Sequence, residues 1–368
     1  MEKTKDKLRI TVFPEEYLIN ATRKIGSGVE SDFLLRVVHL KNTTHDTVTL
    51  KKLQIESKIN GKTVKQVTYP EEIMDTLAQK YAKLITQFTE EIIQIVLGKE
   101  KFWDNKDIPD TATLNPREET GILFEHFRIL DENPVDECVV SVSYLQNGEE
   151  KTTNLKIPVI EYKNKNKYIF PVKGAWMVHG NYDNIHEHRK AHFEEFAMDL
   201  IQLTNDFRFV PHPDSANEEY ACYGKEIYAI ADGEVIDCFD QLPENPKGFN
   251  SRLPQEQWNA LIQQHGWVAG MAGNYVVMKH SGEEYSFYAH LIPQRLTVKK
   301  GDFVKQGQVI GLLGNSGNSD GPHLHFHLMN GPRIWSARGL PCTFTNVKDM
   351  TGELLTLIDQ DRSVVQAD

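Results

Sequence analysis

A run of alternating polar and apolar residues near the C-terminus constrains the fold of this chain more than any other feature. Residues 321–328 read GPHLHFHL. Such alternation predicts a β-strand, whose side chains point to opposite faces in turn. His323, His325 and His327 therefore share one face, while the apolar residues between them can be buried on the other. Neutral imidazole binds zinc and titrates near neutral pH, so one strand can supply a metal ligand and a catalytic group. A surface cluster of histidines is the alternative explanation.

The histidines are concentrated in the second half of the chain. Of the fourteen, His39, His45 and His126 lie in the first 170 residues, and the other eleven fall between His179 and His327. We therefore expect the chemistry to lie in the C-terminal half.

The composition is that of a soluble globular protein and argues against two classes of partner. The 368 residues suffice for two or three domains, and 40% are apolar and 25% charged. The net charge of -11 and the lack of a basic block argue against nucleic acid. No stretch approaches the ~20 apolar residues of a transmembrane helix, which argues against a membrane span.

The N-terminus and the cysteines bear on the cellular compartment. Residues 1–10 read MEKTKDKLRI and lack the apolar core of a secretory signal. This predicts a cytoplasmic protein, or an extracellular or periplasmic one if a leader has been removed. Cys138, Cys222, Cys238 and Cys342 are scattered without a Cys-x-x-Cys pair. They argue against a disulfide framework and a cysteine zinc site, and fit a reducing compartment.

Residues 1–160 predict a β-rich accessory domain, sandwich-like, that carries one long helix. Between about residues 70 and 97, after Pro70 and before Gly98, apolar residues recur every three or four positions. Asn-Gly steps at 60–61 and 147–148 predict hairpin turns. The expected strands are 8–12, 33–40, 48–55, 119–129, 138–145 and 152–160. We expect the helix to pack on its own domain, with a partner surface or a lid over the active cleft as alternatives.

Residues 161–170 are polar and basic and predict a linker, beyond which the chain is again β-rich. We expect an antiparallel β-sheet domain at 171–348 and a C-terminal tail at 349–368, so that the whole protein is mainly β. Glycine-containing turns separate the expected strands, which are 226–231, 233–239, 274–280, 285–291, 308–313 and 323–329. The stretch 241–270 contains three prolines and predicts a long surface loop.

Polar residues in apolar surroundings are the candidates for the site. Asp199 is a single carboxylate in the segment FAMDL, and a buried carboxylate needs a metal or a hydrogen-bond donor as its partner. His186, His188 and His192 precede it, and their spacing does not choose among them. His290 lies in an apolar strand as either a catalytic group or a core histidine with satisfied hydrogen bonds.

Together with the segments around them, these motifs resemble the lysostaphin/LytM-like zinc metallopeptidase family. The resemblance runs from about Trp176 to Phe344, a little under half of the chain. It rests on segments that occur in this order: YG at 223–224, AIADGEV at 229–235, GNYVV at 273–277, YAHL at 288–291, VKKGD at 298–302, GNSG at 314–317 and GPHLHF at 321–326.

The resemblance implies one zinc ion per chain and a set of five site residues. The metal ligands would be His188, Asp199 and His325, and the catalytic histidines that do not bind metal would be His290 and His323. Zinc activates a water molecule and polarises the peptide carbonyl. The two catalytic histidines would orient the water, transfer a proton and stabilise the oxyanion.

Two positions depart from the family pattern. Glu195 stands where a histidine usually precedes the aspartate by four residues. The segment HRKA at 188–191 fits a subgroup with a longer insertion, so His188 is the preferred ligand, His192 the second choice and Glu195 the third. Asp320 stands where serine or threonine is usual, and this charge either alters the substrate preference or caps a turn.

The leading hypothesis is a zinc endopeptidase that hydrolyses peptide cross-bridges or stem peptides of peptidoglycan. One alternative is an intracellular zinc peptidase acting on another peptide or protein, which the absence of a leader would suit. Another is a noncatalytic binding or activating module of the same fold, which would have lost some of these residues. The sequence defines neither the bond cleaved nor the oligomeric state.

Overall fold

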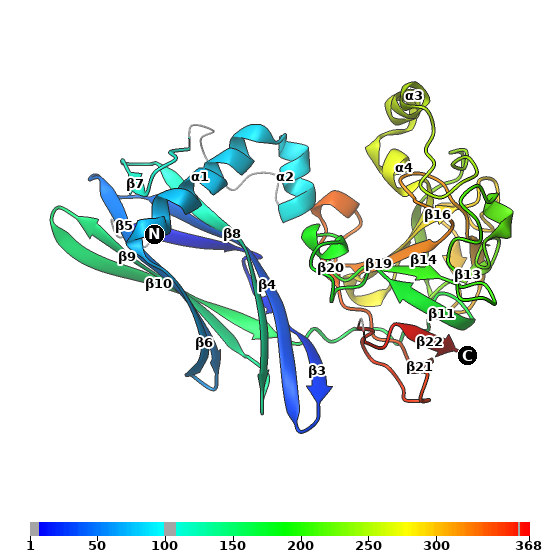
Figure 1. Ribbon diagram of the computed structural model, residues 1–368, viewed down its shortest axis with the longest axis horizontal. Helices are drawn as coiled ribbons and strands as arrows, with labels where there is room; N and C mark the ends of the chain where they lie inside the picture. Colours follow the sequence, from blue (N-terminus) through cyan, green and yellow to red (C-terminus); the bar gives the residue numbers. More distant parts are fainter. Residues whose placement is uncertain (1–6, 99–107, 360) are drawn as a thin grey trace. The chain divides into compact units, whose positions relative to one another are not determined.

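The computed structural model describes residues 7–98, 108–359 and 361–368, and the chain divides into two compact units (Figure 1). Met1–Lys163 form the first unit and Asn164–Asp368 the second.

The N-terminal unit contains two β-sheets that share one hydrophobic core. The first sheet has the order β1 (Leu8–Phe13), β4 (Gly28–Asn42), β3 (Ala21–Ile25), with β8 (Glu119–Asp131) paired to β4. The second has the order β2 (Leu18–Ile19), β10 (Glu149–Ile160), β9 (Glu137–Gln146), β5 (Val48–Ile59), β6 (Lys62–Tyr69), with β7 (Thr113–Leu114) paired to β5. Buried residues of both sheets, such as Phe33, Leu53 and Val140, belong to the common core. The β-rich N-terminal region expected from the sequence is confirmed.

The single helix expected at about 70–97 is in fact two helices, α1 (Glu71–Gln87) and α2 (Glu90–Leu97). The break lies at Phe88, whose backbone is extended, and at Thr89, whose side chain accepts a hydrogen bond from the backbone N–H of Ile92. A threonine at this position is a helix N-cap, so the second helix starts anew. The buried face of α1 repeats every three or four residues, as the sequence pattern predicted.

The C-terminal unit is built on one large sheet with antiparallel pairing. Its strand order is β17 (Phe303–Val304), β14 (Gly233–Phe239), β15 (Asn274–Lys279), β16 (Tyr285–Leu291), β19 (Leu324–Met329), β12 (Met198–Ile201), β11 (Gly174–His179), β22 (Val364–Ala367), β21 (Val347–Asp349), with β20 (Gly339–Leu340) paired to β19. Strands β13 (Glu226–Tyr228) and β18 (Val309–Leu312) form a separate pair. The mainly β, antiparallel fold class is confirmed, and the histidine-rich run forms the central strand β19.

Three segments differ from the expectation. The predicted tail at 349–368 returns to the sheet, because β22 pairs with β11 and buries Val365 and Ala367. The predicted loop at 241–270 contains α3 (Gln255–His265) and the start of α4 (Trp267–Ala272). Part of the predicted linker at 161–170 is packed into the C-terminal unit, since Tyr168 is fully buried and its hydroxyl donates to Glu284 at 2.7 Å.

In the part of the chain that the structure describes, no helix combines the length and the apolar character that crossing a lipid bilayer requires.

Candidate metal and catalytic site

Strand register brings Asp199 and His325 together. Residues 199 of β12 and 325 of β19 are direct antiparallel partners, so their side chains project from the same face of the sheet. His325 Nδ1 lies 3.1 Å from Asp199 Oδ1. Two residues that are 126 positions apart in sequence thus meet at one point.

His188 reaches the same point from the connection between β11 and β12. It begins a short 3₁₀ turn, His188–Lys190, and its Nε2 lies 2.9 Å from Asp199 Oδ2. The connection starts at Gly180, which has φ +63°, and a Cβ there would lie 3.2 Å from Asp199 Oδ2 and 3.2 Å from the His188 ring. A side chain at residue 180 would therefore crowd the cluster.

The three residues are suited to hold one metal ion. One ligand atom each from His188, Asp199 and His325 can be chosen so that all lie within 4.8 Å of one another. Two imidazole nitrogens and one carboxylate oxygen are a donor set typical of catalytic zinc, which leaves a further coordination position for solvent or substrate. The cluster does not include His192 or Glu195, and the carboxylate of Glu195 lies 3.9 Å from Arg189.

A second layer of polar groups lies behind the two histidines. On each ring, the nitrogen that faces away from Asp199 lies near Glu194 Oε2. The distance is 3.7 Å for His188 Nδ1 and 3.6 Å for His325 Nε2. His325 Nε2 is also 3.0 Å from His327 Nδ1. Acceptors at the distal nitrogens of metal-binding histidines fix the ring orientation and tautomer.

His290 reaches the site because its backbone leaves the regular strand conformation. Tyr288 pairs with Phe326 and Ala289 with His325, so regular alternation would turn residue 290 away from the His325 face. Instead His290 has φ +66°, and the pairing of β15 with β16 is irregular here. Its ring centroid lies 4.6 Å from that of His323 and 6.0 Å from that of His325. The left-handed backbone at His290 is what turns its ring toward the His325 face.

The tautomers of His290 and His323 follow from their hydrogen bonds. Each ring donates through Nδ1 to a backbone carbonyl at 2.8 Å, that of Ser316 for His290 and that of Gly321 for His323. The Nε2 atom of each neutral ring therefore keeps its lone pair. His323 Nε2 lies 3.6 Å from Asp199 Oδ1, at the edge of the metal-binding cluster.

The charges of the site influence one another strongly. Burial disfavours the charged form of Asp199, but the neighbouring histidines, His188 first, outweigh it and hold the pKa of Asp199 well below its usual range. Burial likewise acts against protonation of His188, yet the carboxylates of Asp199 and Glu194 raise its pKa well above the usual value. Burial, with the neighbouring imidazoles, lowers the pKa of His290 and of His323. The latter two are therefore neutral near neutral pH.

The five candidate site residues line a cavity of about 720 Å³, which His179 of β11 also lines. One part of its wall is apolar and contains Met177, Ile201, Leu203, Phe207, Phe209 and Phe249. Another part is polar and contains Arg252, whose guanidinium forms an ion pair with Asp320. Asp320, one of the two residues that depart from the family pattern, thus lies in the cavity wall.

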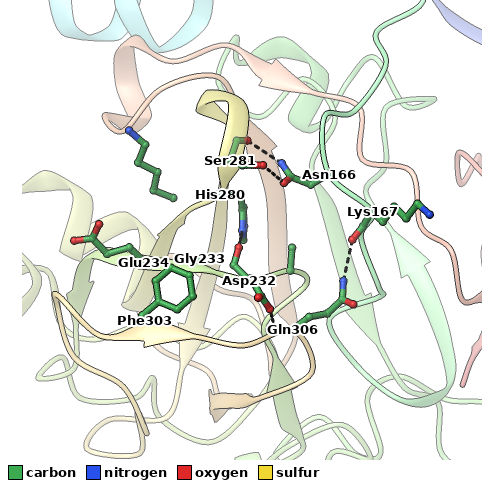
Figure 2. A pocket seen from close by; sticks show the side chains of 11 residues that line it. Asn166, Lys167, Asp232, Gly233, Glu234, His280, Ser281, Phe303 and Gln306 are labelled. Atoms are coloured by element: carbon green, nitrogen blue, oxygen red, sulfur yellow. Dashed lines mark hydrogen bonds between the residues drawn. The ribbon is translucent and has the colours of Figure 1, made fainter.

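A second cavity of about 640 Å³ lies elsewhere in the C-terminal unit (Figure 2). Its histidine, His280, donates through Nδ1 to the Asp232 carbonyl at 2.9 Å and approaches Ser286 Oγ through Nε2 at 2.7 Å. In Figure 2, the Asn166 side-chain amide donates a hydrogen bond to the Ser281 carbonyl, and the Gln306 side-chain amide donates one to the Lys167 carbonyl. These polar groups form separate hydrogen-bonded pairs, and among the described residues they do not belong to a cluster of possible metal ligands.

The sequence did not reveal every residue that shapes the site. It missed Glu194, although this carboxylate lies in the same segment as the candidate Glu195. It placed His327 on the correct face but assigned it no contact with His325. It also missed Phe207, since a single phenylalanine in an irregular segment carries no pattern.

Residues 259–335 match the sequence profile of Peptidase family M23. Peptidoglycan DD-endopeptidase ShyB of Vibrio cholerae is 26% identical over 247 residues, which are 63% of this chain and 49% of that protein. Peptidoglycan DD-endopeptidase ShyA of the same organism is 50% identical over 206 residues, 50% of this chain and 37% of that protein. This chain therefore spans half or less of the length of these relatives.

Among solved structures, the antimicrobial peptidase lysostaphin from Staphylococcus simulans is 21% identical, with a TM-score of 0.27 over 45% of this chain and 47% of that chain. The catalytic domain of the prophage-encoded M23 protein EnpA from Enterococcus faecalis is 18% identical, with a TM-score of 0.26 over 45% of this chain and 87% of that chain.

Proposed function

We propose that the C-terminal unit, in which residues 259–335 match the profile of Peptidase family M23, is a zinc-dependent endopeptidase that hydrolyses peptide bonds in peptidoglycan. The observation that carries the proposal is the convergence of His188, Asp199 and His325 within 4.8 Å at the wall of a cavity of about 720 Å³. The peptidoglycan substrate is supported by the names of the relatives ShyA and ShyB.

His188, Asp199 and His325 would hold the zinc ion. When bound, zinc polarises a carbonyl oxygen and makes a coordinated water acidic enough to attack near neutral pH. His327 would orient the His325 ring by accepting from its distal N–H group, and the Glu194 carboxylate would act on both metal-binding rings by charge, at 3.6–3.7 Å from their distal nitrogens.

His290 and His323 would carry the proton transfers. Their lowered pKa values keep them neutral, and their Nδ1–H groups are engaged with backbone carbonyls. Each Nε2 can therefore accept the proton released from the attacking water, and the protonated ring can then stabilise the oxyanion or donate to the leaving amine. Which ring performs which transfer depends on how the substrate lies.

A peptidoglycan substrate also has a consequence for location. The material lies outside the cytoplasmic membrane, so the proposal favours an extracellular or periplasmic protein over the cytoplasmic and intracellular alternatives. The noncatalytic alternative is disfavoured by the five complete site residues.

The test is digestion of purified peptidoglycan sacculi by the zinc-loaded full chain. We expect soluble wall fragments that carry peptides with new amino groups, and loss of that activity after chelation and its return with zinc. Matched digestions with His323→Ala serve as the control for contaminating hydrolases. Binding to sacculi without release of fragments would instead indicate the noncatalytic module, and hydrolysis of unrelated peptides alone would indicate another substrate.

A further inference from the structure

Phe207 presents an exposed aromatic ring at the wall of the catalytic cavity. Its side chain is 83% exposed, yet it lines the same cavity as His188, Asp199 and His325. Phe207 lies in the irregular segment that follows β12, and the proposed catalytic steps do not use it.

The short loop that carries this ring is closed by its own hydrogen bonds. The Phe207 N–H donates to the Thr204 carbonyl at 2.9 Å, and the Thr204 N–H donates to the Arg208 carbonyl at 2.8 Å. The Thr204 hydroxyl donates to Asp206 at 2.6 Å and accepts from the Arg208 N–H at 3.1 Å. Asp206 and Arg208 also form an ion pair at 2.5 Å. The loop is therefore organised without the help of the Phe207 ring.

The backbone conformation of Phe207 destabilises the folded chain, and the exposed ring adds little stabilising burial to offset this. Its φ is +60°, in the left-handed region that disfavours every residue with a bulky side chain. An exposed ring gains almost nothing from the hydrophobic effect. Backbone strain of this kind is typical of functional sites, where it holds a group in position before a ligand arrives.

The ring belongs to an apolar surface that continues directly from the metal-binding cluster. Ile201 lies two residues after Asp199 on the same face of β12, about 7 Å along the strand, and Met177 is its partner on β11. Phe209 extends this surface and contacts Phe249 edge-on, with ring centroids 6.1 Å apart. The apolar wall therefore starts one side-chain position along the sheet from the metal-binding cluster, beyond Asp199 and its β11 partner His179.

We propose that Phe207 is a specificity-determining residue that closes an apolar subsite for an aliphatic side chain of the substrate peptide, next to the cleaved bond. This rests on the proposed peptidase function. The occupant is the peptide and not the sugar chain, because the wall adjoins Asp199 and the residue beside a scissile peptide bond is itself part of the peptide. Arg252 and Asp320, on the polar part of the wall, leave this surface free for apolar groups.

The experiment compares the zinc-loaded parent with Phe207→Gly and Phe207→Leu. The substrates are cross-linked muropeptides released from sacculi by a muramidase, with their sugars attached, and the same peptides after an amidase has removed the sugars. We expect Phe207→Gly to raise KM about tenfold on both substrates with kcat changed less than about twofold, since a lost apolar contact weakens binding uniformly. Phe207→Leu should recover most of the loss.

A matched control is Phe303→Ala, because Phe303 is another exposed phenylalanine, 66% exposed, at the second cavity. It should behave as the parent. Thermal unfolding separates binding from structure: glycine adopts φ +60° without strain, so Phe207→Gly should melt no lower than the parent. A clearly lower melting temperature would assign Phe207 a structural role and overturn the proposal.

Two further results would overturn it. An unchanged KM in Phe207→Gly would show that the ring does not contact the substrate. A KM increase confined to the sugar-bearing peptides would make the glycan the occupant. If the parent hydrolyses neither substrate, the peptidase proposal fails by itself.

In that case the apolar subsite is tested by binding alone. Calorimetric titration of the uncleaved muropeptides into metal-free parent and metal-free Phe207→Gly measures the two affinities, and equal affinities would count against the subsite.

Discussion

The two cavities of the C-terminal unit are similar in size, about 720 and 640 Å³, and both contain histidine, acidic residues and an exposed phenylalanine. In the first, His188 and His325 both point at Asp199. In the second, His280 has a backbone carbonyl and a serine hydroxyl as its partners. Composition and volume do not distinguish these regions. Convergence of donor atoms does, because a metal ion requires several of them at one point.

The strongest test of this comparison is removal of the shared carboxylate. Asp199→Ala removes the carboxylate ligand from the donor set, so we expect zinc content measured by elemental analysis to fall to background and peptidase activity to be lost. Asp232→Ala, at the second cavity, should keep its zinc. Normal zinc content in Asp199→Ala would remove this residue from the metal site.

The second test separates metal binding from proton transfer. His323→Ala and His290→Ala should retain zinc, whereas kcat falls by about 10²- to 10⁴-fold, the usual contribution of a general acid or base. Zinc content and steady-state kinetics on the same preparations provide the measurement. Parent-like turnover in either variant would contradict the role assigned to that histidine.

The third test concerns the carboxylate behind the metal-binding rings. Glu194→Ala should weaken zinc affinity by about 10- to 100-fold, as expected for loss of an acceptor at the distal nitrogens. Competition with a chromophoric chelator measures this affinity. Glu194→Gln, which retains an acceptor oxygen, should lose less. Glu234→Ala at the second cavity is the matched control, and equal affinities of all four proteins would show that Glu194 does not support the ligands.

The smallest effect is expected at the second cavity, as a pH-dependent change in stability. Burial lowers the pKa of His280 below 6.5 in the folded protein. At a pH between the two pKa values of His280, the unfolded state binds more protons than the folded state. The free energy of unfolding is therefore unaffected by protonation of His280 above about pH 6.5, and it decreases as the pH falls below that value. His280→Gln removes the titration, at a cost of about 1 kcal/mol from the altered hydrogen bonds.

Urea unfolding of the parent and His280→Gln between pH 5 and 7.5 checks this expectation. The difference in unfolding free energy should be largest at the upper end and shrink toward pH 5. A constant difference would mean that His280 is not held neutral by the fold. Zinc content and peptidase activity should be unaffected, which again contrasts the two cavities.

Sequence patterns predicted the parts of this protein that depend on local regularity. Alternation identified β19, and the glycine turns identified β14, β15 and β16 to within a few residues. The helix pattern at 70–97 was correct in its spacing but not in its continuity, because one threonine cap divides it. The pairing of β22 with β11 could not be predicted, since a four-residue strand gains its stability from a distant partner.

The sequence by itself determined that His323, His325 and His327 share a face, because side-chain alternation is a property of any extended strand. Only the tertiary structure decided that Asp199 lies opposite His325, since register between strands 126 residues apart depends on the packing of the whole sheet. It also decided that His290 turns toward them, through a left-handed backbone angle that no residue pattern encodes. Local stereochemistry supplied the donors, and long-range packing brought them to one place.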